Sequence, residues 1–150
     1  MDFFESMDIA ASGLRAERTR MNVTTRNIAN AQTTRTPDGG PYRRQSTVVA
    51  ASPVAAGPES QFGVTLARQL GREEVAGVAV QGVVEDATPP RSVYDPGHPD
   101  ADERGYVLMP NVDLIEEMVT LITASRAYEA GVTALQTLRG MAERAIGIGR

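Results

Sequence analysis

The chain has 150 residues, the size of one ordinary domain, and only 5% of them are aromatic. A compact globule of this length usually has more large apolar side chains, so we expect an elongated chain that shares buried surface with partners. Cysteine is absent, which excludes disulfides and thiolate metal sites. The net charge of −4 argues against non-specific binding to nucleic acid.

Charge is unevenly distributed along the chain. Residues 1–44 contain seven arginines and five carboxylates, a balance of about +2. Residues 73–117 contain eleven carboxylates and two arginines, a balance of about −9. A basic end and an acidic middle would allow pairing between copies, and the alternative is an ordinary solvated surface.

The first predicted element is a helix from Asp2 to Asn30, which no proline interrupts. On one face, apolar residues recur every seven positions and predict a seam for packing within the chain, formed by Met7, Leu14, Met21 and Ile28. A second stripe, about 160–200° away around the helix, consists of Ile9, Ala16 and Val23. One partner helix covers one face only, so we expect the second stripe to contact a neighbouring copy.

The central region is rich in residues that break helices, and it predicts short strands joined by loops. We expect strands at Tyr42–Ala50, Gly77–Glu85, Arg91–Tyr94 and Gly105–Met109, and loops at residues 30–41 and 51–63. These strands are too few and too short for a large sheet.

The second predicted helix begins after Pro110 and ends near Gly147. Asp113 is its expected N-cap, with Glu116 three residues later as in a capping box, and Asn111 is the competing N-cap. Its apolar seam alternates steps of four and three, the spacing of a coiled coil: Leu114, Met118, Leu121, Ser125, Tyr128, Val132, Leu135, Arg139, Ala142 and Ile146.

These elements predict a mainly α fold with a small β-rich centre. We expect an elongated subunit whose long N- and C-terminal helices pair as an antiparallel coiled coil. Residues 1–34 and 111–150 would form the core domain of terminal helices, and residues 35–110 an irregular β-rich central region.

Several short segments that flank the helices resemble a known family. Residues 27–34, Asn-Ile-Ala-Asn-Ala-Gln-Thr-Thr, are similar to the N-terminal signature of flagellar axial proteins, the group of rod, hook and hook-associated subunits. Residues 40–44, 94–107, 110–113 and 125–130 resemble segments of proximal-rod proteins of the FlgC type. Gly131 departs from the pattern, because the family usually has Asn at that place.

The resemblance implies a structural subunit of the proximal rod of the bacterial flagellar basal body, with no enzymatic activity and no cofactor. Such subunits are exported by the flagellar type III system without a cleaved signal, and the acidic N-terminus without an apolar h-region agrees with this. In the periplasm they assemble with their own copies, other rod proteins and components on the export-gate and MS-ring side. The product is a hollow shaft that transmits torque and passes exported subunits. Neither nucleic acid nor membrane insertion is implied.

The candidate assembly residues come from this resemblance and from the periodicity of the helices. They are Ile9, Ala16, Val23, Asn27, Ala29, Asn30, Thr33, Tyr42, Arg43, Asp95, His98, Asp100, Tyr106, Pro110, Asn111, Asp113, Met118, Arg126, Tyr128 and Glu129. The residues expected on the intrachain seam are Met7, Leu14, Met21, Ile28, Leu114, Leu121, Val132 and Leu135. Arg18 and Arg139 also fall on apolar seams. Ion pairs across helices or copies, with Glu129 and Glu143 as candidates, are one explanation, and a solvent-exposed seam edge is the other.

Two alternatives remain. The first is another axial component of the flagellum. The second is a small periplasmic metal-binding protein or enzyme that uses His98, Asp100 and Asp102. Residues 100–105 have the D-x-D spacing of a Ca²⁺ loop, but Arg104 occupies position five and Asn111 replaces the Glu of position twelve. No nucleophile lies at a useful spacing from His98, so we expect neither metal nor catalysis.

Overall fold

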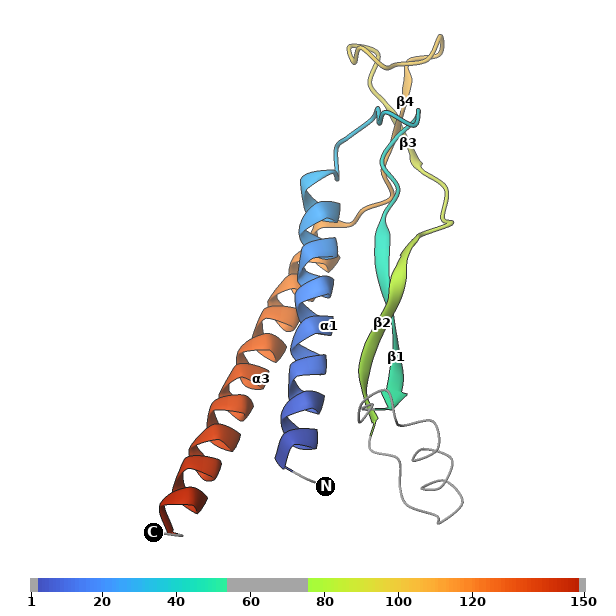
Figure 1. The fold of residues 1–150 in the computed structure, drawn as a ribbon. Helices are drawn as coiled ribbons and strands as arrows, with labels where there is room; N and C mark the ends of the chain where they lie inside the picture. The colour runs from blue at the N-terminus through green and yellow to red at the C-terminus, as the bar shows by residue number, and fades with distance from the viewer. Residues whose placement is uncertain (1–2, 54–75, 149–150) are drawn as a thin grey trace. The chain divides into compact units, whose positions relative to one another are not determined.

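A computed structural model describes residues 3–53 and 76–148 of the chain. Helix α1 spans Phe3–Ala29 and helix α3 spans Leu114–Ile148. Between them come four strands, β1 (Gln45–Pro53), β2 (Ala76–Glu85), β3 (Arg91–Tyr94) and β4 (Tyr106–Met109) (Figure 1). The prediction of a mainly α fold with two long terminal helices and a small β content is therefore confirmed. No helix in the described part of the chain is apolar over a length sufficient to cross a membrane.

The strands form two small sheets, β1 with β2 and β3 with β4. In the second sheet the strands are antiparallel, and Arg91 pairs with Met109 while Tyr94 pairs with Tyr106. Strand β1 differs from the prediction, because it continues through residues 51–53, which were expected to begin a loop. It also begins later than expected, since the amide of Tyr42 donates to the Thr33 carbonyl (3.0 Å) and closes the preceding loop. Residues 54–63 of the expected loop lie outside the described residues.

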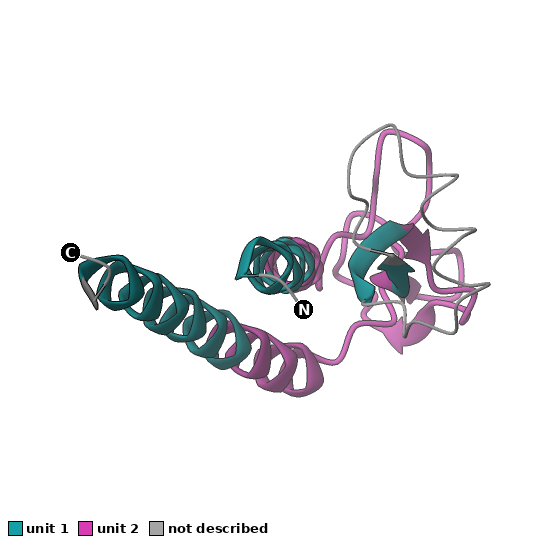
Figure 2. Cartoon of the chain, turned by 60° about the horizontal axis from the view of Figure 1, so that its bottom comes forward, with its two compact units in different colours: residues 1–17, 49–81, 126–150 teal, residues 18–48, 82–125 magenta. Residues whose placement is uncertain are grey.

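The chain divides into two compact units (Figure 2). Unit 1 comprises residues 1–17, 49–81 and 126–150, and unit 2 comprises residues 18–48 and 82–125. Each helix contributes one part to each unit. The expected division into a helical core and a β-rich centre stays a prediction.

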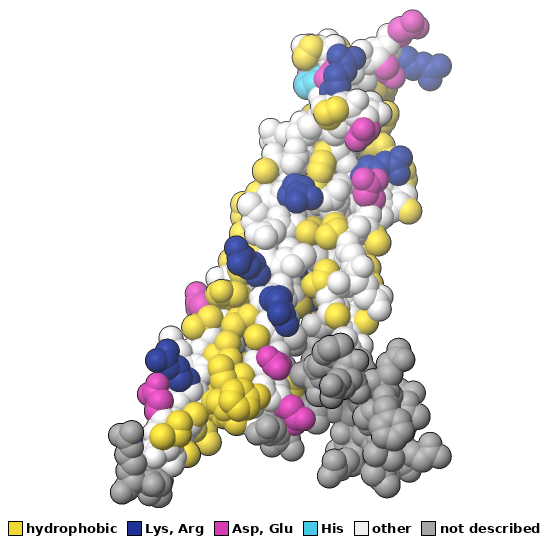
Figure 3. Space-filling model, in the orientation of Figure 1, with side chains coloured by type: hydrophobic (Ala, Val, Ile, Leu, Met, Phe, Trp, Pro, Cys, Tyr) yellow, Lys and Arg dark blue, Asp and Glu magenta, His cyan; other side chains and the backbone are white. Residues whose placement is uncertain are grey.

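In unit 1, the N-terminal half of α1 contacts α3 at Gly131. A β-carbon placed on Gly131 would lie 2.8 Å from Leu14 Cδ2, so the missing side chain gives Leu14 its space. Ser12, which is buried, accepts a hydrogen bond from the Val78 amide of β2 (3.0 Å). On the face seen in Figure 3, hydrophobic side chains gather over these two helix halves, while charged side chains are scattered.

In unit 2, the apolar core is small. Its buried apolar side chains include Val23 of α1, Val107 of β4, Val112 and Ala124. A large share of the remaining buried volume belongs to polar side chains, Thr24, Asn27 and Glu117. This unit therefore depends on the pairing of those polar groups as much as on apolar contact.

The buried face of α1 differs from the expected one. Ala16 and Val23 of the second stripe are buried within the chain and Ile9 is half-buried, whereas the four residues of the expected intrachain seam are all half-buried. Leu14 of the expected seam nevertheless contacts α3, because Gly131 leaves space for its side chain. Ala16 and Val23 thus have little surface left for a neighbouring copy.

The same shift is seen on α3. Leu114 and Met118 of the predicted seam are exposed, and the buried positions of this part of the helix are Glu117 and Ala124. With Gly131, these positions form a seven-residue repeat of a charged residue followed by two small ones. The spacing of large apolar residues does not reveal this repeat, because its members are either charged or small.

Candidate functional site

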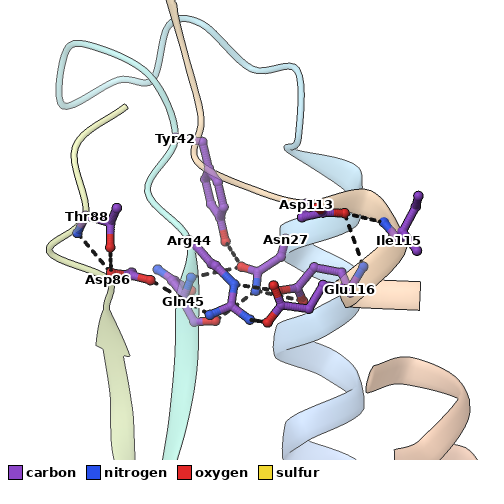
Figure 4. Close-up of polar contacts among 10 residues, drawn as sticks. Asn27, Tyr42, Arg44, Gln45, Asp86, Thr88, Asp113, Ile115 and Glu116 are labelled. Atoms are coloured by element: carbon purple, nitrogen blue, oxygen red, sulfur yellow. Dashed lines mark hydrogen bonds and ion pairs between the residues drawn. The ribbon is translucent and has the colours of Figure 1, made fainter. Parts of the chain in front are cut away.

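The centre of unit 2 contains a group of hydrogen-bonded side chains, here called the Glu117 cluster: Asn27, Tyr42, Arg44, Gln45, Asp86, Glu116 and Glu117 (Figure 4). Asn27 belongs to the last turns of α1, and its side chain is 1% exposed. Its Nδ2 donates to the Gln45 carbonyl (2.8 Å) and to Glu117 Oε2 (3.1 Å). Its Oδ1 accepts from Tyr42 Oη (2.9 Å) and from the Gln45 amide (2.9 Å). Asn27 therefore uses its full hydrogen-bonding capacity to join α1, the start of β1 and α3.

Glu117 is the buried carboxylate of this cluster, and it is also only 1% exposed. Arg44 Nε donates to its Oε1 at 2.6 Å, and Asn27 occupies its other oxygen. The same guanidinium lies 3.3 Å from Glu116 Oε1 and 3.8 Å from Asp86 Oδ2. A buried carboxylate is tolerated when it is paired and hydrogen-bonded, and here both oxygens have partners.

The cluster changes the acid–base behaviour of two of its members. Burial lowers the pKa of Arg44, but its hydrogen bond to Glu117 and the charges of Glu117, Glu116 and Asp86 raise it, and the net shift is upward. Burial raises the pKa of the Tyr42 phenol; the charge of Arg26 opposes this rise, and those of Glu117 and Glu85 add to it. Both groups are held in the protonation state that their partners require.

Asp86 forms the solvent-facing edge of the cluster, just after β2. Its Oδ1 accepts from the hydroxyl (2.6 Å) and the amide (2.9 Å) of Thr88. These hydrogen bonds lower the pKa of Asp86, and the charge of Arg44 acts in the same direction. The Asp86 amide donates to the Arg44 carbonyl (2.8 Å), so the edge is also tied by backbone.

The start of α3 places Glu117 in position. Asp113 Oδ1 accepts from the amides of Ile115 (2.8 Å) and Glu116 (3.2 Å), which confirms Asp113 as the N-cap. Glu116 does not complete a capping box in the observed contacts, since its carboxylate binds Arg44. The cap fixes the first turn of the helix, and Glu117 then faces α1.

A hollow of about 190 Å³ adjoins the cluster, and Arg44, Glu117, Thr24 and Thr120 contribute to its lining. Arg44 and Glu117 are bound to each other there, so neither serves as a base or a nucleophile. The hydrogen bonds of the cluster join separate segments of the chain. Among the described residues, the cluster contains no arrangement typical of a catalytic site.

The second predicted region is the β3–β4 hairpin, whose loop is built from its own hydrogen bonds. The Asp95 amide donates to the Gly105 carbonyl (2.9 Å), and Asp102 Oδ1 accepts from the amides of Arg104 (2.9 Å) and Tyr106 (2.8 Å). Gly105 has φ +81°, and a β-carbon there would lie 3.0 Å from the Tyr94 ring. Only glycine meets both conditions without strain.

The loop is tied to the segment after α1. Thr34 Oγ1 donates to Asp100 Oδ2 (2.8 Å), and Arg35 lies 3.8 Å from the same carboxylate. The Asp100 amide donates to His98 Nδ1 (3.1 Å). Within the described residues, no group of three or more metal-ligating side chains is arranged to hold an ion.

The structure brings some of the predicted assembly residues together and leaves others apart. Asn27 and Tyr42 meet in the Glu117 cluster, and Asp95, His98, Asp100 and Tyr106 belong to the hairpin and its loop. Asn30 Nδ2 caps the Arg26 carbonyl (2.9 Å), and Thr33 donates to Asn30 (3.2 Å). Pro110 is buried, and Asn111 and Tyr128 are half-buried. The exposed members are Ala29, Arg43, Asp95, Tyr106, Asp113, Met118, Arg126 and Glu129.

On the predicted intrachain seam of α3, Leu121, Val132 and Leu135 are half-buried and Leu114 is exposed. Arg139 Nε lies 2.9 Å from Glu143 Oε1 of the same helix, whereas the prediction was an ion pair across helices or copies. Arg18 is exposed.

The central members of the cluster, Arg44, Gln45 and Glu117, were not predicted as site residues. One signal was available for Glu117: it precedes Ala124 and Gly131 at seven-residue spacing, and small residues at that spacing mark a close helix contact. No local signal identifies Gln45, because its contribution is made mainly by its backbone.

Comparison with known proteins gives the family. A family model described as flagella basal body rod protein matches residues 7–35, and one described as flagellar basal body rod FlgEFG protein C-terminal matches residues 103–148. The chain is 43% identical to the flagellar basal-body rod protein FlgC of Borreliella burgdorferi, over 99% of this chain and 98% of that protein. It is 40% identical to FlgC of Escherichia coli O6:H1 and 38% identical to FlgC of Bacillus subtilis, in each case over the whole of both chains. The chain therefore belongs to the FlgC family of flagellar basal-body rod proteins.

Proposed function

We propose that this chain is a structural subunit of the proximal rod of the bacterial flagellar basal body, assembling with other rod proteins into the shaft that transmits torque. The observation that carries this proposal is the end-to-end match to proteins named as flagellar basal-body rod proteins. The role is structural and not enzymatic, as the names of those relatives indicate.

The two terminal helices pair, in this proposal, as an antiparallel coiled coil. Within unit 2, residue 27 of α1 is bonded to residue 117 of α3, and within unit 1, residue 14 contacts residue 131. As residue numbers rise along α1, the numbers of their partners on α3 fall, as expected for antiparallel helices. Leu14, one of the half-buried seam positions of α1, lies in this contact.

The Glu117 cluster fixes the register of this pairing. An apolar contact made by small residues tolerates sliding, because neighbouring registers bury similar area. Asn27 and Glu117 accept only one register, since a shift of one turn would leave a buried carboxylate and a buried amide without partners. A subunit that transmits torque needs helices that do not slide, and the cluster provides that constraint.

The route and partners of the subunit follow from the same proposal. Export by the flagellar type III system without a cleaved signal would deliver it to the periplasm, where it joins its own copies and other rod proteins, with components on the export-gate and MS-ring side at one end. Of the predicted assembly residues, the exposed Arg43, Arg126 and Glu129 are the best placed for such contacts. The hollow shaft so formed would also pass exported subunits.

A deletion strain tests the proposed function. Cells that lack the chain should form no hook and should not swim, and purified basal bodies viewed by electron microscopy should lack a complete rod. A plasmid copy should restore all three properties, and the tagged chain should be found in the basal bodies. A deletion strain with normal hooks and normal motility would contradict the proposal.

A matched pair of variants connects the function to the cluster. Glu117→Ala removes the buried carboxylate, and Glu116→Ala removes its exposed neighbour on the same turn of α3. We expect the first to complement motility poorly and the second to complement it well. Normal motility in both strains would show that the buried carboxylate is not needed for the rod.

A further inference from the structure

The loop between α1 and β1 contains the sequence Thr-Pro-Asp-Gly-Gly-Pro at residues 36–41, and Asp38–Gly39 is the one Asp–Gly pair of the chain. An aspartate before glycine is chemically labile, because glycine has no β-carbon to shield its amide nitrogen from the preceding carboxyl group. The nitrogen attacks Asp38 Cγ, and the carboxyl hydroxyl leaves with the amide proton as water. Water then reopens the succinimide ring at either carbonyl, which gives aspartate or isoaspartate.

The surroundings of Asp38 leave this reaction unhindered. Asp38 and the two glycines that follow it are exposed, and no hydrogen bond or ion pair holds the Asp38 carboxylate to another of the described residues. A β-carbon on Gly39 or Gly40 would meet no atom within 4 Å, so neighbouring side chains do not cover the pair. Burial therefore does not protect Asp38.

The backbone of the same loop opposes closure of the ring. The Gly39 amide donates to the Thr36 carbonyl (3.0 Å), which closes a β-turn with Pro37 and Asp38 at its centre. Among the described residues only glycines have a positive φ, so this hydrogen-bonded turn is of type I, in which ψ of Asp38 is about 0°. A flat five-membered ring needs Cβ and the Gly39 nitrogen on the same side of the Cα–C bond, a rotation of ψ by about 120° from the turn value. That rotation breaks the hydrogen bond.

Further contacts of Thr36 stabilise the turn. The Thr36 amide donates to the Gly40 carbonyl (2.9 Å), and Thr36 Oγ1 donates to the same oxygen (3.2 Å). Gly39 and Gly40 have φ of +88° and +79°, values that glycine adopts without strain. The Gly39 nitrogen is thus held away from Asp38 Cγ as long as the loop stays closed.

We propose that Asp38 is the site of isoaspartate formation in this chain, and that the turn of residues 36–40 protects it by holding the Gly39 amide in a hydrogen bond. Isomerisation then requires local opening of the loop, so its rate follows the population of the open loop. The product would carry one extra backbone atom between Thr36 and Gly40, which are bonded to each other. Tyr42 of the Glu117 cluster follows two residues later, so the turn protects the segment that leads into the cluster.

Peptide mapping of the purified full chain tests this proposal. Trypsin cuts after Arg35 and Arg43 and releases residues 36–43, in which reversed-phase chromatography separates isoaspartate from aspartate and an isoaspartyl methyltransferase identifies it. On incubation at mildly acidic pH, isoaspartate should form roughly 10–100-fold more slowly in the folded chain than in the synthetic peptide 36–43, because opening breaks the hydrogen bonds of the turn. Asp38→Glu should abolish the signal in both.

A matched pair of glycine variants tests the role of the turn. Gly40→Ala strains the turn at a φ of +79° and leaves the Asp38–Gly39 pair unchanged, so isoaspartate should form roughly five- to thirtyfold faster in the folded variant than in the wild type. Gly82→Ala is the control, because Gly82 has no positive φ and a β-carbon there would meet no atom within 4 Å. Its rate should equal that of the wild type.

Thr36→Val gives an independent measurement if Gly40→Ala does not fold. It removes the hydroxyl bond to the Gly40 carbonyl and keeps the backbone bonds, so the rate should rise about threefold. Thr34→Val, which loses a hydroxyl bond to Asp100 outside the turn, is its control. Equal rates in the folded chain and the peptide, wild-type rates in the turn variants, or more isoaspartate at another residue than at Asp38 would each overturn the proposal.

Discussion

The two sides of the first turns of α3 reverse the usual distribution of side chains. The side that faces α1 carries Glu117, a carboxylate with almost no exposed surface, while the opposite side exposes the apolar side chains of Ile115, Met118 and Ile122 to solvent. A helix of a self-contained globule would place the apolar face inward and the charge outward. In α3 the face toward α1 is held by directional hydrogen bonds, and the opposite face exposes apolar side chains that can contact another molecule.

This reversal separates two tasks of one helix. The inner face fixes the pairing within the subunit, because hydrogen bonds with Asn27 and Arg44 depend on direction as well as distance. The outer face suits association with another molecule, because apolar area is non-directional and contributes when water is removed from it. The difference predicts that mutations on the two faces affect different properties.

The largest expected effect is on the inner face. Glu117→Ala should lower the free energy of unfolding by about 3 kcal/mol, because Arg44 and Asn27 lose a buried partner. Ile115→Ala on the outer face should change it by no more than about 0.5 kcal/mol. Urea unfolding followed by circular dichroism measures both. Similar losses in the free energy of unfolding for the two variants would contradict the different roles of the two faces of α3.

The inner face extends along α3 to Gly131 in unit 1, and a substitution there comes next in size. Gly131→Leu should destabilise by about 1–3 kcal/mol, because its β-carbon alone would reach to 2.8 Å from Leu14 Cδ2. Leu14→Ala should restore part of that loss by making room. The control is Gly140→Leu, where the nearest atom to a β-carbon is 3.8 Å away, and a gain in helix propensity of about 1 kcal/mol is expected. Equal effects at the two glycines would contradict close packing at Gly131.

The sequence predicted the elements better than it predicted which faces are buried. Heptad spacing and helix caps located both helices, and turn residues located the strands, because these signals are local. The residue Asp113 was correctly predicted as the N-cap.

The burial of Glu117 and the exposure of Leu114 were not predictable in this way. The spacing of apolar residues along a helix shows which faces could be buried. Which of them is buried depends on which face offers small residues and matching polar groups to the partner. For the Glu117 cluster, that match joins residues 27, 44 and 117, which are far apart in the chain. The conformation of the backbone at Gln45, which supplies two of the bonds to Asn27, has no sequence signature.

Tyr42→Phe should give a smaller effect. It tests the part of the Glu117 cluster that lies next to the loop between α1 and β1. It removes one hydrogen bond to Asn27, whose Oδ1 keeps the Gln45 amide, so a loss of about 1 kcal/mol is expected. The folded-state pKa of Tyr42 is raised, so the stabilisation from its neutral form is complete below its ordinary pKa of 10.0. It disappears as pH rises through the raised value. Urea unfolding between pH 8 and 11 should show this alkaline loss in the wild type and a smaller one in Tyr42→Phe, while the exposed Tyr94→Phe should behave like wild type.

The smallest effect concerns Asp86, the solvent-facing edge of the Glu117 cluster. A substitution there should change stability less than one at the buried Glu117. Thr88→Val removes the hydroxyl that donates to Asp86 Oδ1 and leaves the amide, so the pKa of Asp86 should rise toward its ordinary value of 3.8. A depressed folded-state pKa stabilises the fold above the unfolded value, and this contribution is lost as pH falls through the folded value. The variant should therefore be less stable than the wild type at neutral pH, and this difference should shrink on acidification below about pH 4. Carboxyl titration by NMR and urea midpoints at acid and neutral pH measure the two consequences, with the exposed Thr25→Val as control. An unchanged Asp86 pKa would show that the Thr88 amide and Arg44, and not the Thr88 hydroxyl, lower it. The Thr88 hydroxyl would then not belong to the hydrogen-bonded network around Glu117.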